Sequence, residues 1–358
     1  MKQLVIAGLL MLSGIASAQT QISKYQPGVT PEGAVYFLPK TALRIVVQVE
    51  KTTYTPGDFA KYAERYMRIK DVAQEPSVQY KVNTIGMTTV GVADTSKCYA
   101  VKYNAKNASA NIQLADDGTL LAINATATPQ AEPQKFAAAP KALPVNPRLY
   151  MNEEILAAGS TAKMAELTAL EIYEIRDSKN QLTRGQADFM PKDGEQMRIM
   201  LGQLSAQDAA LTGMFTGTTV RDTAEYVFMY YPDREVNRQV LFRLSGKLGL
   251  VDADDLSGTP FYISVSDLHA TPAPQADNGK KKKKPQPVED GIYINVPGKI
   301  KVTVEQGNLP MSSFEVQAGQ FGTTELLSGD LFNKRFTTHL TLNPTTGAVL
   351  RLEAEQPK

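Results

Sequence analysis

The sequence predicts an α+β fold that is rich in β-structure, with two small antiparallel β modules, a possible duplication, flanking an α+β middle module with two amphipathic helices. Three observations predict this fold. β-Branched and aromatic residues alternate with polar residues in the first and last thirds of the chain, as in half-buried strands. Helical periodicity is clearest between residues 160 and 217. Two proline-rich stretches divide the chain into three parts.

The first eighteen residues have the pattern of a secretory signal peptide. Lys2 provides the positive start, Leu4–Leu12 the short apolar run, and Ala16-Ser17-Ala18 the cleavage site. No cysteine follows the run to carry a lipid anchor, and no later stretch has the roughly 20 apolar residues of a membrane helix. We therefore expect a soluble, exported bacterial protein that begins at Gln19, in the periplasm or associated with the outer membrane.

The composition excludes several classes of function. The chain has 38 Lys and Arg and 37 Asp and Glu residues, and the predicted leader holds one of the basic residues, so the mature chain is formally neutral. Nucleic acid is therefore not an expected partner. Cys98 is the one cysteine and cannot form an internal disulfide. His269 and His339 are the two histidines, which leaves few candidates for transition-metal or Ser/His chemistry, and no cofactor is expected.

Proline-rich composition predicts linkers at residues 126–149 and 271–288, since such segments cannot bury apolar surface. The linkers separate predicted modules at residues 19–125, 150–270 and 289–358. The second linker contains Lys280–Lys284, which could attract polyanions. A solvated spacer is favoured, because the lysines have no aromatic residues among them.

In the N-terminal module, β-branched residues predict strands at Val35–Leu38 and Leu43–Val49. A helix is expected to follow, with Thr55 as its N-cap and a core-facing stripe that includes Phe59 and Tyr62. Further strands are predicted at about 78–92 and 98–103. The module ends in a hairpin of residues 112–114 and 120–123, whose turn closes at Gly118.

The middle module contains the clearest helices. The first runs from Thr161 to Ile175 with Ser160 as its N-cap, and the second starts after Asp193 and runs to Gly217. Three strands follow, at residues 225–231, 239–244 and 260–265.

A weak internal repeat links the first and last modules. Tyr36–Pro39 followed by Leu43–Glu50 resembles Tyr293–Pro297 followed by Ile300–Glu305. Gly86–Val90 resembles Gly322–Leu326, and Gly118–Ala125 resembles Gly347–Ala354. Three matches in the same order favour a duplication, although alternation and glycine turns are common to all antiparallel β modules.

Ser160 and Lys163 are the candidate catalytic residues. A serine at a helix N-terminus with a lysine three residues later is the pattern that serine β-lactamases and penicillin-binding proteins use to activate a nucleophile. The Lys-Thr/Ser-Gly strand that those enzymes also need is absent. Capping by Ser160 explains the same residues without catalysis and is the favoured interpretation.

Asp252, Asp254 and Asp255 are the candidate calcium ligands. They gather three carboxylates in one loop, and calcium prefers oxygen ligands. The loop lacks the glycine and glutamate positions of an EF-hand, so a solvated turn is favoured.

Four segments carry a resemblance to a known family: Tyr36–Leu43, Pro56–Ala63, Arg184–Asp188 and Pro191–Gln196. Together they resemble an uncharacterised exported family of Bacteroides and its relatives, domain of unknown function 4831, over nearly the whole mature chain. The resemblance implies a location in a Gram-negative envelope and brings no catalytic residues with it.

These observations favour a non-catalytic binding or scaffold protein with an envelope protein or a glycan as its partner. The first alternative is a hydrolase that acts on an envelope polymer or glycan, and the second is a protein that binds a small ligand. The chain has no tryptophan, so a carbohydrate platform would depend on tyrosine or phenylalanine.

Overall fold

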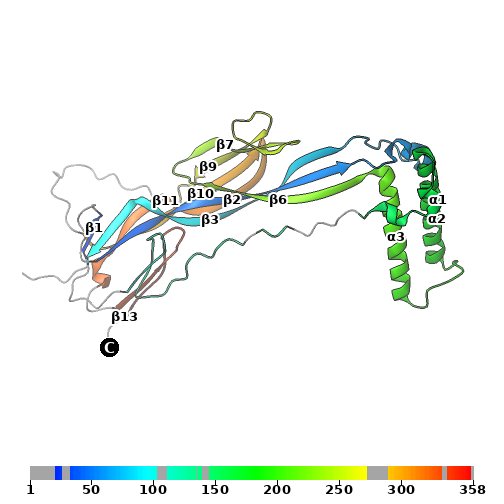
Figure 1. Ribbon diagram of the computed structural model, residues 1–358. Helices are drawn as coiled ribbons and strands as arrows, with labels where there is room; N and C mark the ends of the chain where they lie inside the picture. The colour runs from blue at the N-terminus through cyan, green and yellow to red at the C-terminus, as the bar shows by residue number, and fades with distance from the viewer. Residues whose placement is uncertain are drawn as a thin grey trace, which may run out of the picture.

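A computed structural model describes residues 21–25, 33–102, 111–134, 136–138, 145–271, 289–332 and 337–355. The predicted signal peptide at 1–18, the Lys280–Lys284 tract, residues 272–288 of the second linker and residues 135 and 139–144 of the first lie outside the described residues. The molecule is elongated, with a β stalk, a helical head at one end and a smaller sheet near the other (Figure 1). The predicted β-rich α+β fold class is confirmed.

Two long antiparallel hairpins form the stalk. In one, β2 (Gly33–Thr55) pairs with β3 (Ser77–Lys102), and in the other, β10 (Glu289–Gln306) pairs with β11 (Leu309–Ser328). β6 (Thr218–Tyr230) pairs along the other side of β2, and β9 (Thr259–Asp267) pairs along the other side of β10. The remaining strands of the large sheet are β7 (Val236–Ser245), β8 (Gly249–Val251) and β1 (Gln21–Lys24), which joins β3 to β10.

The strands of the stalk enclose a shared apolar core. Alternate residues of β2 and β10 point into it, as the alternating sequence pattern predicts. Fully buried are Leu43, Ile45 and Val47 on β2, and Ile300, Val302 and Val304 on β10. The ring of Phe242 on β7 stacks between Phe228 and Phe261, at centroid distances of 5.0 and 4.5 Å. The stalk is therefore held together by contacts between distant parts of the chain.

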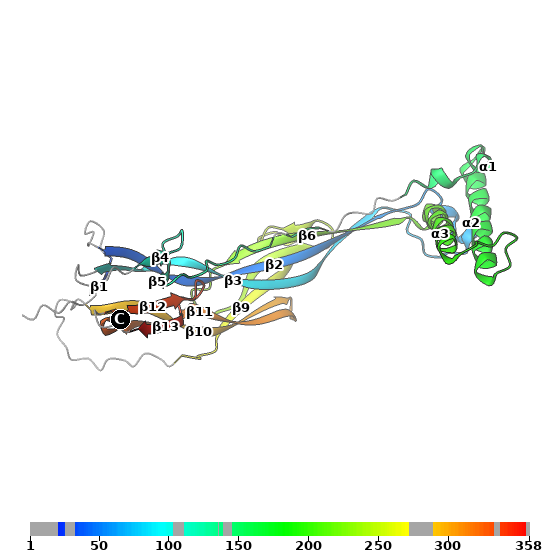
Figure 2. The same ribbon diagram turned by 90° about the horizontal axis from the view of Figure 1, so that it is seen from below.

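A smaller antiparallel sheet lies near the end of the stalk opposite the head (Figure 2). Its strands, in spatial order, are β13 (Val349–Glu355), β12 (Thr337–Leu342), β5 (Leu120–Ile123) and β4 (Ile112–Leu114). The one-turn helix η4 (Gly329–Phe332) precedes β12. The predicted hairpin of β4 and β5 is confirmed, with Gly118 at φ +80° in its turn.

The two halves of the molecule share one arrangement, which supports the duplication. Each long hairpin has a register shift close to its start, at Phe37/Pro39 in one and at Val296/Gly298 in the other. The turn glycine of each short hairpin, β4–β5 or β12–β13, packs against the first strand of the long hairpin in the same half. The N–H of Phe37 on β2 donates to the carbonyl oxygen of Gly118 (3.0 Å), and the N–H of Asn295 on β10 donates to the carbonyl oxygen of Gly347 (3.2 Å). Both glycines have positive φ.

The helical head is built from segments that follow β2 and precede β6. Its longest elements are α2 (Thr161–Arg184) and α3 (Gly194–Thr216), and its shorter ones are α1 (Glu153–Leu156), η1 (Ala60–Tyr62), η2 (Ala63–Met67) and η3 (Pro147–Tyr150). The predicted caps are confirmed: Ser160 caps α2, and Asp193 caps α3 by accepting the N–H of Gln196 at 2.8 Å. No helix in the described part of the chain is long and apolar enough to cross a membrane.

The predicted helix after Thr55 is wrong in its start and type. Thr55 is the last residue of β2 and pairs with Thr218, so it does not cap a helix. The helical residues begin at Ala60 and form a 3₁₀ turn followed by a π turn. Phe59 and Ala63 are buried against α3 and α2, so tertiary packing sets the local conformation.

Strands from the three sequence segments pair with one another. β6, from the middle segment, lies beside β2, and β9 lies beside β10. β12, from the last segment, pairs with β5 of the first. The core is consequently shared among the segments 19–125, 150–270 and 289–358.

Candidate functional site

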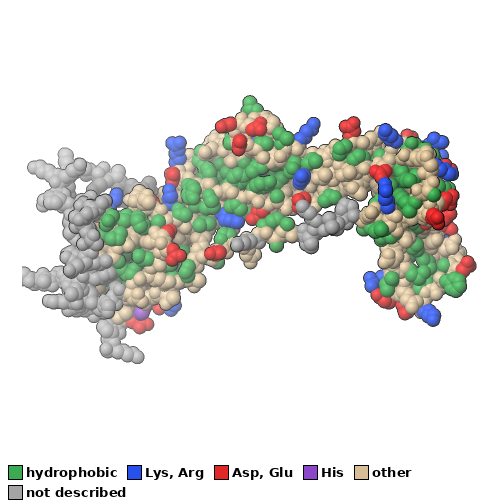
Figure 3. Space-filling view, viewed as in Figure 1, with side chains coloured by type: hydrophobic (Ala, Val, Ile, Leu, Met, Phe, Trp, Pro, Cys, Tyr) green, Lys and Arg blue, Asp and Glu red, His purple; other side chains and the backbone are tan. Residues whose placement is uncertain are grey.

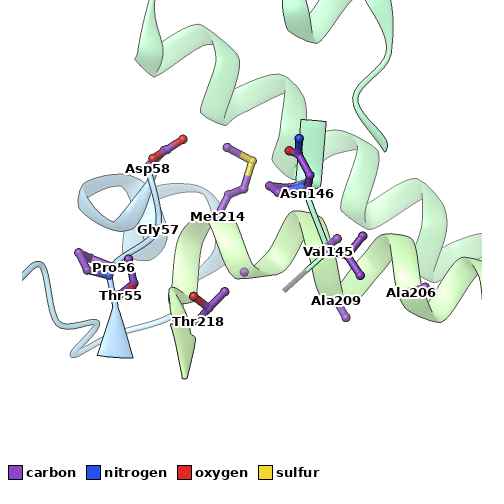
Figure 4. A pocket seen from close by; sticks show the side chains of 13 residues that line it. Thr55, Pro56, Gly57, Asp58, Val145, Asn146, Ala206, Ala209, Met214 and Thr218 are labelled. Carbon is purple, nitrogen blue, oxygen red and sulfur yellow. The ribbon is translucent and has the colours of Figure 1, made fainter. Parts of the chain in front are cut away.

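A pocket lies where the head joins the stalk, at the end of β2 and the start of β6 (Figure 4). Its volume is about 560 Å³. Helix α3 forms one wall, Thr55–Asp58 a second and Val145–Pro147 a third, and Thr218 closes one end. We call this site the corner pocket.

The pocket wall is the face of α3 that points away from the core of the head. Leu211 and Phe215 are fully buried in that core, with Leu204 packed against it. Half a helical turn away, small residues face the pocket, since 3.6 residues complete one turn. The pocket-lining residues of this face are Ala206, Ala209, Ala210 and Gly213. Met214, at the border of the two faces, also lines the pocket and is buried in the core of the head. The small side chains let the pocket reach close to the helix backbone.

Two glycines fix the geometry of this corner. A Cβ on Gly57 would lie 2.1 Å from the carbonyl oxygen of Met214, so only glycine lets β2 end this close to α3. Two residues later, the N–H of Phe59 donates a hydrogen bond of 2.8 Å to the carbonyl oxygen of Met214. Gly217 ends α3 at φ +77° and lies against the carbonyl oxygen of Thr55. The chain therefore turns from helix to strand within one residue.

The rim of the corner pocket is polar. Asp58, Thr55 and Thr218 are exposed there. The side-chain oxygen of Asn146 accepts the N–H of Arg148 at 3.1 Å, which orders the chain that enters η3. An apolar wall with a few polar groups at its edge is the usual composition of a site for an apolar ligand or side chain.

The head also exposes many large apolar side chains. Phe189 is 88% exposed and Leu149 is 76% exposed. Others on the head that are exposed are Leu156, Leu170, Tyr173, Met190, Ile199 and Met200. In the space-filling view, apolar side chains are visible at this end of the molecule among charged and other polar groups (Figure 3). These residues belong to η3, α1, α2, α3 and the loop between α2 and α3. Exposed apolar side chains are typical of interaction surfaces where they form a contiguous patch.

A buried polar network joins the two long hairpins at the other end of the stalk. The side-chain amide of Asn295 donates to the carbonyl oxygens of Pro39 (2.8 Å) and Thr346 (3.0 Å). Its oxygen accepts a hydrogen bond of 3.0 Å from the Lys97 amine, whose pKa is lowered by burial. Burial also raises the pKa of the neighbouring Cys98 thiol. These contacts tie the two halves of the molecule together.

Ser160 and Lys163 lie at the start of α2. The Ser160 hydroxyl oxygen accepts the backbone N–H of Lys163 at 3.2 Å, which is the capping interaction. The Lys163 amine lies 3.4 Å from a carboxylate oxygen of Glu166. Neither residue lines the corner pocket.

Asp252, Asp254 and Asp255 lie in the loop between β8 and β9. The Asp255 carboxylate accepts the N–H of Ser257 at 2.8 Å, which lowers the pKa of that carboxyl. The side chain of Arg243 donates to the carbonyl oxygen of Ala253 at 2.6 Å. Within the described ranges, no group of three or more His, Cys, Asp or Glu side chains is arranged to hold a metal ion.

Sequence reasoning did not identify the corner pocket. Its walls come from segments separated by long stretches of chain, around residues 55, 145 and 210. One local signal was present: small residues recur along α3 on the side opposite its apolar stripe.

The fold and the pocket define a β-rich α+β protein with a helical head. The chain belongs to the family catalogued as a domain of unknown function, DUF4831, whose model matches residues 32–350. A search of curated proteins and of solved structures found no match.

Proposed function

We propose that this protein is a non-catalytic binding or scaffold protein of the cell envelope whose helical head holds a protein partner. The observation that carries the proposal is the corner pocket, an apolar site on the outward face of α3. The exposed apolar side chains of the head add surface of the kind that protein interfaces bury. The predicted signal peptide at residues 1–18 supports an exported location, periplasmic or associated with the outer membrane.

The test is crosslinking in intact cells, followed by affinity purification and mass spectrometry of the tagged protein. Ala210 lines the pocket, so the variant Ala210→Leu fills it from α3. The control is Ser205→Leu, which introduces the same side chain at an exposed α3 position outside the pocket lining. We expect one stoichiometric partner with the wild-type and Ser205→Leu chains and a loss of about tenfold or more with Ala210→Leu, as for an anchor residue of an interface.

Equal recovery of the partner with all three chains would contradict binding at the corner pocket. Recovery of nothing above background would contradict a stable partner altogether. Fractionation of the same cells tests the location, because an exported chain leaves the cytoplasmic fraction and loses residues 1–18.

Binding of a small apolar ligand is a second candidate function, favoured by the size of the pocket. Ligand sites commonly enclose about 300–1,000 Å³, and the corner pocket falls in that range. Native mass spectrometry of protein from the original cells would detect a bound molecule, which Ala210→Leu should displace. A hydrolase that uses Ser160 and Lys163 stays a third candidate and is tested below.

A further inference from the structure

β6 is an edge strand with one open side. It pairs with Leu43–Thr55 of β2 without a register shift, and no second strand forms a backbone ladder with it in the described part of the chain. Its contacts with β7 are made by side chains, between Phe228 and Phe242 and between Tyr230 and Gln239. Natural proteins interrupt long edges with bulges, prolines or lysines, which hinder further pairing. The segment Ala224–Tyr230 of β6 has none of these. Its one charged side chain, Glu225, lies 3.6 Å from Arg44 in an ion pair.

The second half of the molecule shows how the equivalent edge is covered. β9 holds the position on β10 that β6 holds on β2: Phe228 pairs with Ile45, and Val265 pairs with Val302. The other side of β9 is covered by β7, which pairs with it antiparallel. The same fold therefore accepts an added antiparallel strand at this place.

The uncovered edge leaves core side chains partly exposed. Ile263 and Val265 of β9 are 0% and 2% exposed beneath β7. Their counterparts on β6, Tyr226 and Phe228, pack against the same core and are only half-buried. An added strand would remove this apolar surface from water and pair the outward backbone groups of β6, both of which favour binding.

We infer that the open edge of β6, from Ala224 to Tyr230, binds an extended segment of a partner protein as an additional antiparallel strand. The segment it fits has apolar side chains at alternate positions, as β7 has at Phe242 and Leu244. A strand that continues along β6 to Thr218 reaches the corner pocket, which Thr218 lines. The inference rests on the proposed function, because it specifies how the partner is held.

A second copy of the chain fits this edge less well. In Figure 1 the head extends from the end of β6 on the side of the open edge. Antiparallel pairing of β6 with β6 of another copy would bring the head of each molecule against the stalk of the other. A short segment in extended conformation avoids this contact between heads and stalks.

The test measures hydrogen exchange of the full chain with a synthetic peptide of residues 236–245, the sequence of β7. Alternate amides of Ala224–Tyr230 point to the open side, and we expect the peptide to slow their exchange about tenfold or more. A Phe242→Ser peptide should lose this effect, because it removes an inward apolar side chain. An Arg243→Ser peptide, changed at the adjacent position, should retain it.

Three results would overturn the inference. The first is no slowing at the highest soluble concentration of the peptide. The second is protection of the outward amides of β6 in the free monomer that is lost when the predicted linker, residues 126–149, is replaced. That result would mean that the chain covers its own edge. The third is protection that rises with protein concentration, which would identify a second copy. In each case, the proposed function would still hold if the crosslinking experiment recovered the partner with the wild-type chain and lost it with Ala210→Leu.

Discussion

The hydroxyl group of Tyr36 donates a hydrogen bond of 3.2 Å to the carbonyl oxygen of Tyr293 and accepts one of 3.0 Å from its backbone N–H. Tyr36 is fully buried. The two tyrosines occupy matching positions in the two halves of the chain. A side chain from one half thus satisfies the backbone of the other half close to the start of its long hairpin.

Replacing Tyr36 with phenylalanine should lower the free energy of unfolding by about 1–3 kcal/mol, because the backbone N–H and carbonyl oxygen of Tyr293 each lose a hydrogen bond. Chemical denaturation measures the change. Tyr231→Phe is the control, since Tyr231 is 48% exposed, and it should stay within about 0.5 kcal/mol of the wild type. Equal stability of Tyr36→Phe and the wild type would show that the contact contributes nothing.

Alanine at Gly57 should destabilise the head by about 1–3 kcal/mol or more, since its Cβ would overlap the backbone of Met214. Gly202→Ala is the matched control in α3, where a Cβ meets nothing within 4 Å. The free energy of unfolding of Gly202→Ala should rise by up to about 1 kcal/mol, because alanine has a higher helix propensity than glycine. Thermal unfolding followed by circular dichroism compares them, and the same sign for both variants would contradict the close approach at Gly57.

Stability should depend on pH through Lys97, whose pKa in the folded state is lowered by burial from its ordinary value of 10.5. Between the lowered value and 10.5, the unfolded chain binds more protons than the folded chain, so the free energy of unfolding rises with pH. Below that window, both states are protonated and the dependence vanishes. Denaturation at several alkaline pH values, for the wild type and for Lys97→Met, measures the difference in slope.

The comparison should stay below pH about 9.5, because tyrosines titrate near pH 10. Burial raises the pKa of Tyr99, so its ionisation works in the opposite direction and lowers stability as pH rises further. Identical slopes for the wild type and Lys97→Met would mean that the amine is not desolvated in the folded state.

Substitutions at Ser160 separate capping from catalysis. Ser160→Ala should cost about 1 kcal/mol, because the N–H of Lys163 loses its acceptor. Ser160→Asp keeps a good capping group and removes the serine nucleophile, so it should restore stability. If the wild type hydrolyses envelope glycans and Ser160→Asp does not, the result would favour a catalytic role for Ser160. Equal hydrolytic activity of the two chains would favour a capping role alone.

The helix starts and the short hairpin could be predicted because their signals are local. Ser160, Asp193 and Gly217 act within one turn of the helices that they begin or end. Gly118 closes a turn between strands only a few residues apart. In each case, a single residue type satisfies a specific backbone requirement.

The pairing of distant strands and the corner pocket could not be predicted in this way. Thr55 pairs with Thr218, but nothing near Thr55 in the sequence indicates this pairing, and the local pattern predicts a helix cap. Alternation predicts which face of a strand is buried but does not specify its neighbour. The pocket depends on that pairing, since it lies where β2 and β6 end together.

β2 and β6 run antiparallel, side by side along the stalk, and this pairing has a mechanical consequence. Tension between the head and the far end acts along these strands, so their thirteen residue pairs are loaded in shear together instead of being opened one after another. A pair of strands whose hydrogen bonds must all break together resists force better than a pair whose hydrogen bonds break one at a time from one end. A partner that pulls on the head would therefore transmit its load to the opposite end of the molecule with little yielding in between.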